Sequence, residues 1–132
     1  MKLTTNFTLE EMTRSSSAAK LGIRNVPTVQ QIENLRLLCK HLLQPLRDGY
    51  GKPLNISSGF RCRSLNEAVG GSPTSDHLHG LAADIATSNP MALFAWVCRL
   101  NLPFDQAIIG KGYLHLSWRT QARKVCFAQD KN

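Results

Sequence analysis

The chain has 132 residues, of which 42% are hydrophobic and 19% charged, and its formal net charge is +7. This length and composition suit one globular domain over residues 1–132 and exclude a disordered chain. The longest apolar run, Met91 to Cys98, is far shorter than the roughly 20 residues that cross a bilayer, so no membrane span is expected. Residues 1–6 lack the apolar core of a signal peptide, which predicts a protein made in the cytoplasm.

Two helices are predicted in the first third of the chain. A capping box over residues 8–11 begins a short helix that should stop near Gly22. The same signal returns at Thr28, and apolar residues then recur at helical spacing, which predicts a longer helix from about Val29 to Arg47. Pro45 is expected to kink or shorten the last turn of this helix.

The remaining chain is predicted to hold the strands and one more helix. Residues 54–57 and 81–86 read as strands, and between them lies a long Gly-, Ser- and Asn-rich loop of the kind that is usually functional. A helix should open at Asn89-Pro90 and run to about Leu100. Residues 104–109 and 113–118 are expected to pair as a hairpin. Helices first and strands mostly later predict an α+β domain with a small antiparallel sheet.

The four cysteines contain no C-x-x-C pair, which argues against a zinc knuckle or a thioredoxin-like motif. Without an export signal, reduced thiols are expected. Cys39 and Cys98 lie in apolar helical stretches and are interpreted as small core residues.

The positive charge lies at the two ends of the chain. Residues 1–52 carry a net +4, residues 53–110 a net −1 and residues 111–132 a net +4. The basic run from Arg119 to Lys124 is the only local support for nucleic-acid binding, and no helix-turn-helix, zinc-finger or stacking motif accompanies it. We therefore expect no nucleic-acid partner and interpret the run as a solvated face.

Three potential metal ligands stand out in the nearly neutral middle and late parts of the chain. His77 lies in the predicted loop, Asp84 on the strand that follows it, and His115 on the late hairpin. Two imidazoles and one carboxylate, with water in the fourth position, make the pattern of an open catalytic zinc site. The competing interpretation is that these side chains are only solvated or hydrogen-bonded.

The sequence motifs around these residues resemble those of the zinc D-Ala-D-Ala carboxypeptidase family, which includes many phage and bacterial peptidoglycan peptidases. The family pattern S-G-[FY]-R, then S-x-H-x-x-G-x-A-x-D, then x-H-x-S is matched at residues 58–61, 75–84 and 114–117. The Phe7–Met12 opening and the Leu102–Gln106 run are similar to its short phage-type branch. The resemblance implies an α+β fold of the hedgehog and D-Ala-D-Ala peptidase kind. In that fold, helices pack on one side of a small antiparallel sheet and the zinc site lies at one end of the sheet.

Carried over residue by residue, the resemblance implies Zn2+ as cofactor, held by His77, Asp84 and His115. Arg61 would bind or polarise the substrate near the scissile bond, since its fork suits a carboxylate or carbonyl oxygen, or else it pairs with a loop carbonyl. Ser75 either hydrogen-bonds the substrate or orders the loop. Tyr113 and Trp118 flank His115 and are expected to line the site.

The sequence departs from the family at the general base. These peptidases place a carboxylate three or about six residues before the last His ligand, whereas this chain has Ile109-Gly110-Lys111-Gly112 there. The remaining candidates are Asp76, His79 and Asp105. His79 is the preferred catalytic candidate because a histidine both accepts and donates protons near pH 7.

Two functional hypotheses follow. The leading one is a monomeric zinc peptidase that cleaves a peptide bond in the peptidoglycan stem, as a D-Ala-D-Ala carboxypeptidase or an endolysin-like endopeptidase. Without its own signal, such an enzyme would reach the wall after lysis or by virion delivery. The alternative is a module that keeps fold and zinc but is catalytically impaired, and that binds the wall or serves as a scaffold.

Overall fold

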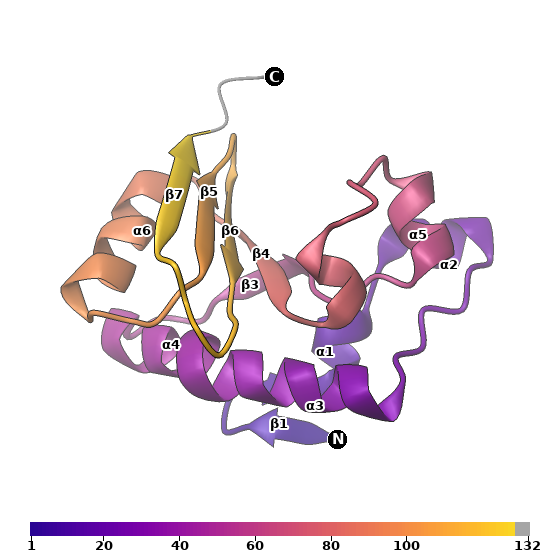
Figure 1. Ribbon diagram of the computed structural model, residues 1–132, viewed down its shortest axis with the longest axis horizontal. Coiled ribbons are helices and arrows are strands. Elements are labelled where there is room, and N and C mark those ends of the chain that lie inside the picture. Colours follow the sequence, from indigo (N-terminus) through magenta and orange to yellow (C-terminus); the bar gives the residue numbers. More distant parts are fainter. Residues whose placement is uncertain (129–132) are drawn as a thin grey trace.

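The computed structural model describes residues 1–128, and its elements follow one another as shown in Figure 1. The helices are α1 (Leu9–Thr13), α2 (Ser16–Leu21), α3 (Val29–Leu38), the π-helix η1 (Cys39–Leu43), α4 (Gln44–Tyr50), α5 (Arg63–Ala68), the 3-10 helix η2 (Asp76–His79) and α6 (Pro90–Arg99). The strands are β1 (Lys2–Thr4), β2 (Phe7–Thr8), β3 (Asn55–Ser58), β4 (Ala82–Ala86), β5 (Gln106–Ile109), β6 (Tyr113–Ser117) and β7 (Val125–Ala128).

The main sheet has five strands in the order β3-β4-β6-β5-β7. The first four are antiparallel neighbours, and β5 and β6 form the predicted hairpin. The edge strand β7 instead runs parallel to β5, so the sheet is mixed rather than purely antiparallel. The small β1–β2 pair and β7 are both absent from the sequence prediction. Strands of three and two residues, such as β1 and β2, carry too little alternation to be recognised. The α+β class itself is confirmed.

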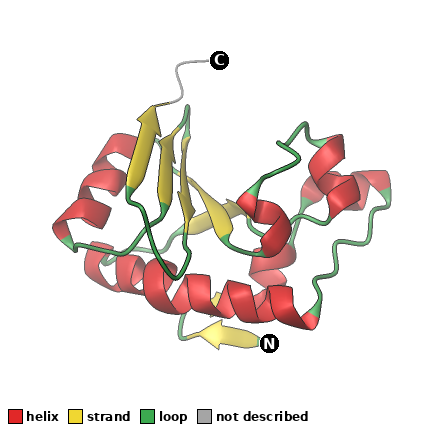
Figure 2. Ribbon diagram, viewed as in Figure 1, coloured by secondary structure: helices red, strands yellow, loops and turns green. Residues whose placement is uncertain are grey.

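The two faces of the main sheet have different roles, as the alternating directions of the side chains along β4 show. Ala83 and Ile85 point into the hydrophobic core, while Asp84 between them points to the opposite face. Helix α6 packs on the core face, and the segment with α5 and η2 lies across from the other face (Figures 1 and 2). One face of the sheet is therefore structural, and the other is free to carry polar side chains.

A long helical segment runs beneath both halves of the molecule and contributes six buried residues to the core. It is continuous through α3, η1 and α4, and the leucines that predicted it are fully buried at positions 35, 38, 42, 43 and 46. It extends to Tyr50 and ends at Gly51, whose φ is +78°. Pro45 does not shorten it. The missing N–H of Pro45 is accommodated by the π turn directly before it, in which Gln44 donates its N–H to the carbonyl of Cys39.

The first predicted helix is divided in two. Arg14 has an extended backbone after α1, and the Ser15 hydroxyl then accepts a hydrogen bond from the N–H of Ala18 to begin α2. The serine-rich stretch that follows α1 offered an N-cap, and a new cap restarts a helix rather than continuing it. The end at Gly22, with a φ of +69°, is as expected.

The cysteine interpretation is half right. Cys39 is fully buried in the core, and burial raises the pKa of its thiol to about 12. Cys98 was expected to be buried as well, but it is exposed on α6, because the buried face of this short helix is formed by Leu93 and Val97. All four cysteines are free thiols in the structure.

No helix within residues 1–128 is long and apolar enough to cross a membrane.

Helix α3 also holds the 3-10 helix η2, which packs against it. The side chains of Gln31 and Asn34 donate hydrogen bonds to the carbonyls of Leu78 (3.2 Å) and His79 (2.8 Å). Gly80 ends η2 with a φ of +74°, and a Cβ there would lie only 2.7 Å from the carbonyl oxygen of Gln31. The 3-10 turn is thus positioned by direct backbone contact with α3, and this contact requires glycine.

Replacing Gly80 by alanine tests this contact. Gly80→Ala should lower the free energy of unfolding by roughly 2–4 kcal/mol, since it adds a backbone clash to the left-handed φ. Gly22→Ala is the matched control, because Gly22 is also left-handed but a Cβ there meets nothing within 4 Å. It should cost only about 1–2 kcal/mol. Urea unfolding measures both, and equal losses would contradict the proposed role of the close approach.

Candidate metal centre

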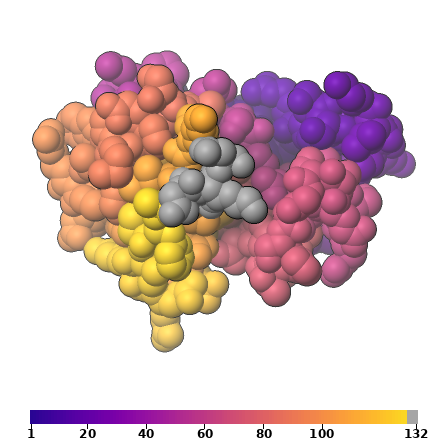
Figure 3. Space-filling model, turned by 90° about the horizontal axis from the view of Figure 1, so that it is seen from above, coloured from indigo at the N-terminus to yellow at the C-terminus, as the bar shows by residue number. Residues whose placement is uncertain are grey.

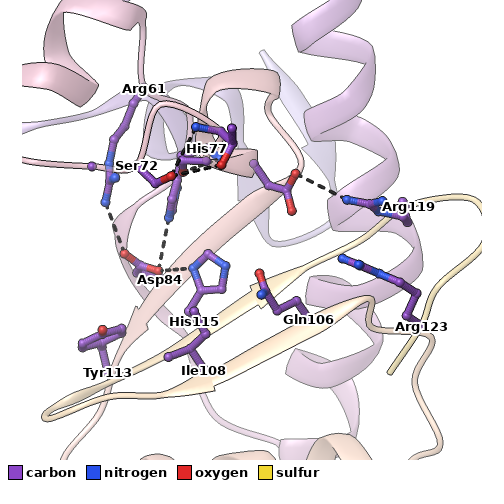
Figure 4. A pocket seen from close by; sticks show the side chains of 14 residues that line it. Arg61, Ser72, His77, Asp84, Gln106, Ile108, Tyr113, His115, Arg119 and Arg123 are labelled. Carbon is purple, nitrogen blue, oxygen red and sulfur yellow. Dashed lines mark hydrogen bonds and ion pairs between the residues drawn. The ribbon is translucent and has the colours of Figure 1, made fainter. Parts of the chain in front are cut away.

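Three side chains from distant parts of the chain meet on the open face of the sheet. Asp84 and His115 are directly opposite each other in the register of β4 and β6, and His77 reaches them from η2 (Figure 4). One potential ligand atom from each residue lies within 4.8 Å of the other two. The site therefore lies on the face of the sheet, at the middle of β4 and β6, because a cross-strand pair supplies two of its three groups.

The spacing of these atoms fits a single zinc ion. The Asp84 Oδ1 atom lies 2.8 Å from His115 Nδ1 and 3.3 Å from His77 Nε2. Ligands at about 2.0–2.1 Å from a tetrahedral zinc are roughly 3.3 Å from one another. Two neutral imidazoles and a carboxylate are also the donor set of open zinc sites. The three residues predicted as ligands are thus brought together in a form that suits Zn2+.

A backbone carbonyl sets the tautomer of His77. His77 Nδ1 lies 2.6 Å from the carbonyl oxygen of Gly59, and a carbonyl can only accept, so Nδ1 carries the proton and donates it. His77 Nε2 is left with its lone pair facing Asp84 and His115, as a metal ligand requires. Position 59 must be glycine, because a Cβ would lie 2.3 Å from the Met12 carbonyl oxygen.

The charge state of Asp84 follows from the same contacts. Burial alone raises the pKa of this carboxyl, but the adjacent side chains of His115 and His77 outweigh burial and hold the pKa well below its usual range. The side chain of Asp84 is 16% exposed, so the carboxylate remains ionised in a largely dry setting. An ionised carboxylate is the form that binds a cation.

Arg61 is fixed beside this group by three partners. Its Nε donates to the Ser58 hydroxyl at 3.0 Å, its Nη1 to the Asn66 side-chain oxygen at 3.2 Å, and its Nη2 lies 3.5 Å from Asp84 Oδ2. Asn66, itself buried, is held by donating to the Ser72 carbonyl at 2.9 Å. Arg61 is thus held by side chains from β3, α5 and β4 rather than by the loop carbonyl of the structural interpretation, and it borders the metal group.

These residues border a pocket of about 580 Å³. Arg61, Ser75 and Tyr113, which were predicted to bind the substrate, all line it. In the space-filling view the segment around α5 and η2 and the C-terminal strand form separate prominences (Figure 3). The pocket-lining residues come from the former segment, from β4, β5 and β6, and from the stretch that precedes β7. Three further lining residues, missed as site residues, are Gln106, Arg119 and Arg123.

Ser75 and Trp118 each turn out to have a structural contact. The Ser75 hydroxyl accepts the N–H of His77 at 3.1 Å and so caps η2, which supports the loop-ordering alternative. Trp118 does not line the pocket; its ring stacks on His41 at 4.8 Å and packs against the core. It lies away from the site because the alternation of faces that puts Leu114 and Leu116 in the core also directs Trp118 to that side, opposite His115.

The candidates for the general base are placed very differently. His79 is exposed and does not border the pocket, because η2 turns after His77 and directs the next histidine away from the sheet. The geometry therefore gives no support to a catalytic role for His79. Asp76 does line the pocket, and among the described lining residues it is the one carboxylate outside the metal group. Asp105 lies behind the wall, with a fully buried side chain.

Asp105 is the anchor of the chain segment after β6. One of its carboxylate oxygens accepts from the backbone N–H of Arg123 (3.0 Å) and from Arg123 Nε (2.9 Å). The other oxygen accepts from Arg123 Nη2 (2.9 Å) and lies 3.0 Å from Arg119 Nε. The hydrogen bond from the Arg123 side chain lowers the pKa of Asp105, and the Arg119 charge adds to this effect. The carboxylate thus fixes two arginines at the pocket wall.

Removing two of the metal ligands one at a time tests the centre. Wild-type protein purified without chelators should carry about one zinc per chain, whereas His77→Ala and Asp84→Ala should carry almost none, since each removes one of three ligands. His79→Ala is the matched control and should keep the wild-type content. Elemental analysis measures this, and zinc contents near zero in the wild type, or unchanged in the ligand variants, would contradict the assignment.

The Asp105 anchor predicts a pH-dependent loss of stability. The folded pKa is lowered, so the ionised carboxylate stabilises the fold above its unfolded pKa of about 3.9 and this stabilisation is lost as pH falls through the folded value. Asp105→Asn should lower the free energy of unfolding at pH 7 by roughly 2–3 kcal/mol, and the deficit should shrink at pH 3. Asp48→Asn, at an exposed aspartate, should change it by less than about 0.5 kcal/mol. A deficit that does not change with pH in urea unfolding would exclude the charge as its cause.

Comparison with known proteins agrees with this geometry. The family model described as Peptidase M15 matches residues 5–117, which include all three metal-group residues and Arg61. A zinc D-Ala-D-Ala carboxypeptidase from Streptomyces albus G is 34% identical over 110 residues, which cover 82% of this chain and 41% of that protein. The chain thus spans about two fifths of the length of this relative. The match over most of the chain, together with the His-Asp-His group, shows that the chain belongs to the Peptidase M15 family.

Proposed function

We propose that the protein is a zinc-dependent peptidase that cleaves a peptide bond in the stem peptide of peptidoglycan. The observation that carries this proposal is the His77, Asp84 and His115 group at the base of an open pocket, with Arg61 fixed beside it. The carboxypeptidase from Streptomyces albus G supports the choice of a wall peptide as substrate. Acting on the wall would follow release by lysis or delivery by a virion.

Zinc in such a group supplies Lewis-acid activation of water and of a carbonyl. The chain's own residues supply the positioning. The Gly59 carbonyl fixes the tautomer of His77. Ser58 and Asn66 hold the Arg61 guanidinium in place, and its remaining N–H groups orient a carbonyl or carboxylate oxygen of the substrate. Tyr113 lines the same pocket and offers an aromatic surface to the peptide.

A second candidate, a wall-binding module with impaired catalysis, is favoured by one observation. The end of β5 and the turn after it carry Ile109-Gly110-Lys111-Gly112 where the family resemblance places a carboxylate, three or about six residues before His115. The Tyr113 ring lies over Gly110, so that a Cβ at position 110 would be 2.1 Å from it. Proton transfer by a positioned side chain typically contributes about 10²–10⁴-fold, so its loss would leave binding with little turnover.

Digestion of purified muropeptides distinguishes the two candidates. Zinc-loaded wild type should release D-alanine, as a carboxypeptidase, or expose a new amino terminus within the stem, as an endopeptidase; His115→Ala should lower the rate more than about 100-fold. His79→Ala, outside the pocket, should keep the wild-type rate. Mass spectrometry detects both products. If zinc-loaded protein yields no product but still sediments with isolated sacculi, the result would contradict the peptidase and support the binding module.

A further inference from the structure

The two arginines anchored by Asp105 have unused hydrogen-bond donors that face the pocket. A guanidinium has five N–H groups. Arg123 uses Nε and Nη2 on Asp105, and Arg119 uses Nε on Asp105 and approaches Asp76 with Nη2 at 3.8 Å. Within residues 1–128, neither Nη1 has a hydrogen-bond or ion-pair partner. Both side chains line the pocket and are about half exposed, at 45% and 54%.

The arginine pair lies across the pocket from Arg61. Figure 4 shows Arg61 on one side of the metal group and Arg119 with Arg123 on the other, and Gln106 lies between His115 and Arg123. Gln106 shares this face because it is two residues from Ile108, the β5 partner of His115. Its side-chain amide has no partner within the described part of the chain. Polar groups therefore continue from the metal group to the arginine pair.

The surrounding charges favour an anion at this place. Asp76, Asp84 and Asp105 balance Arg61, Arg119 and Arg123, so the charge that a zinc ion brings has no counterpart in the pocket. Arg123 already holds one carboxylate, that of Asp105, through two parallel N–H bonds from Nε and Nη2, which leaves its Nη1 for a ligand. Guanidinium forks are suited to this geometry, and Asp105 holds these two rigidly, which reduces the entropy lost on binding.

We propose that Arg119 and Arg123 form a carboxylate-binding subsite that makes the protein select peptides with a free carboxylate near the bond at the metal. The inference rests on the proposed function for the peptide nature of the ligand. The carboxylate has two sources in a peptide, the carboxyl terminus and an acidic side chain. Asp105 is the positioning residue of this subsite, acting only through the arginines.

Three peptides test the subsite on zinc-loaded full-length protein. They are acetyl-D-alanyl-D-alanine, its carboxamide, and the carboxamide of acetyl-D-glutamyl-D-alanine. KM and kcat are measured for a peptide that is cleaved, and Kd by calorimetry for one that is not. At least one carboxylate peptide should bind roughly 10-fold tighter than the neutral carboxamide, and which of them does so identifies the source.

Arg119→Gln is the principal variant, because Asp105 keeps its three hydrogen bonds from Arg123 and the fold is retained. It should reduce the carboxylate preference to within about twofold through KM or Kd, and Arg119→Lys should restore part of it. Lys124→Gln is the matched control, since it removes the same charge from the same segment but contacts Asn101 outside the pocket. It should keep the wild-type preference.

The outcomes separate this inference from the proposed function. Equal binding of all three peptides by the wild type, or a preference that survives in both Arg119→Gln and Arg123→Gln, would overturn the subsite even if every peptide is cleaved. A preference that depends on Arg119 in a protein that cleaves none of them would support the subsite and count against the peptidase.

Discussion

The cross-strand pairing of Asp84 with His115 is the constraint on which the functional half of the molecule depends. It places a carboxylate and an imidazole on one face of β4 and β6, while their neighbours Ala83 and Leu116 lie in the core on the other. A shift of the register by one residue would move both polar groups into the core and the apolar ones into the pocket. Core packing therefore fixes the register, and the register fixes two of the three ligands.

The third ligand depends on a different kind of interaction. His77 comes from a 3-10 turn outside the sheet, and its place is set by hydrogen bonds from side chains of α3, by the Ser75 cap and by the Gly59 carbonyl. Glycine appears at both close approaches, positions 59 and 80, because neighbouring main-chain oxygens leave no room for a Cβ. The motifs around the ligands thus contain residues required for steric reasons, such as these glycines, as well as the ligands themselves.

Two carboxylates, at and behind the pocket wall, have different electrostatic roles. Asp84 lies between histidines and is available to a cation, whereas Asp105 is saturated by arginines and serves to hold a chain segment in place. Both have a lowered pKa, but through different neighbours, histidines beside Asp84 and arginines beside Asp105. A lowered pKa on its own therefore does not identify a catalytic acid or base in this protein, and the neighbours of each carboxylate decide its role.

The sequence predicts the elements with strong periodicity or caps, because apolar residues at helical spacing and N-caps are local signals. It predicts the metal group through the family motifs around His77, Asp84 and His115, since the spacing of these three residues alone is a weak signal. It does not predict the edge strand β7, the π turn before Pro45 or the exposure of Cys98, which depend on tertiary packing. Arg119 and Arg123 were noticed as a basic run, but only the three-dimensional contact with Asp105 shows that they face the pocket. His79 illustrates the reverse error, since closeness to His77 along the chain says nothing about the direction of its side chain.

The packing of the Tyr113 ring on Gly110 links two positions that are three residues apart in the chain. Any side chain at position 110 must displace this ring, so a carboxylate cannot be added there while the aromatic wall of the pocket stays as it is. The two positions are therefore interdependent. A chain with an acidic residue at 110 would need a different arrangement at 113, and a search for relatives that share this pocket shape should examine both positions as a pair.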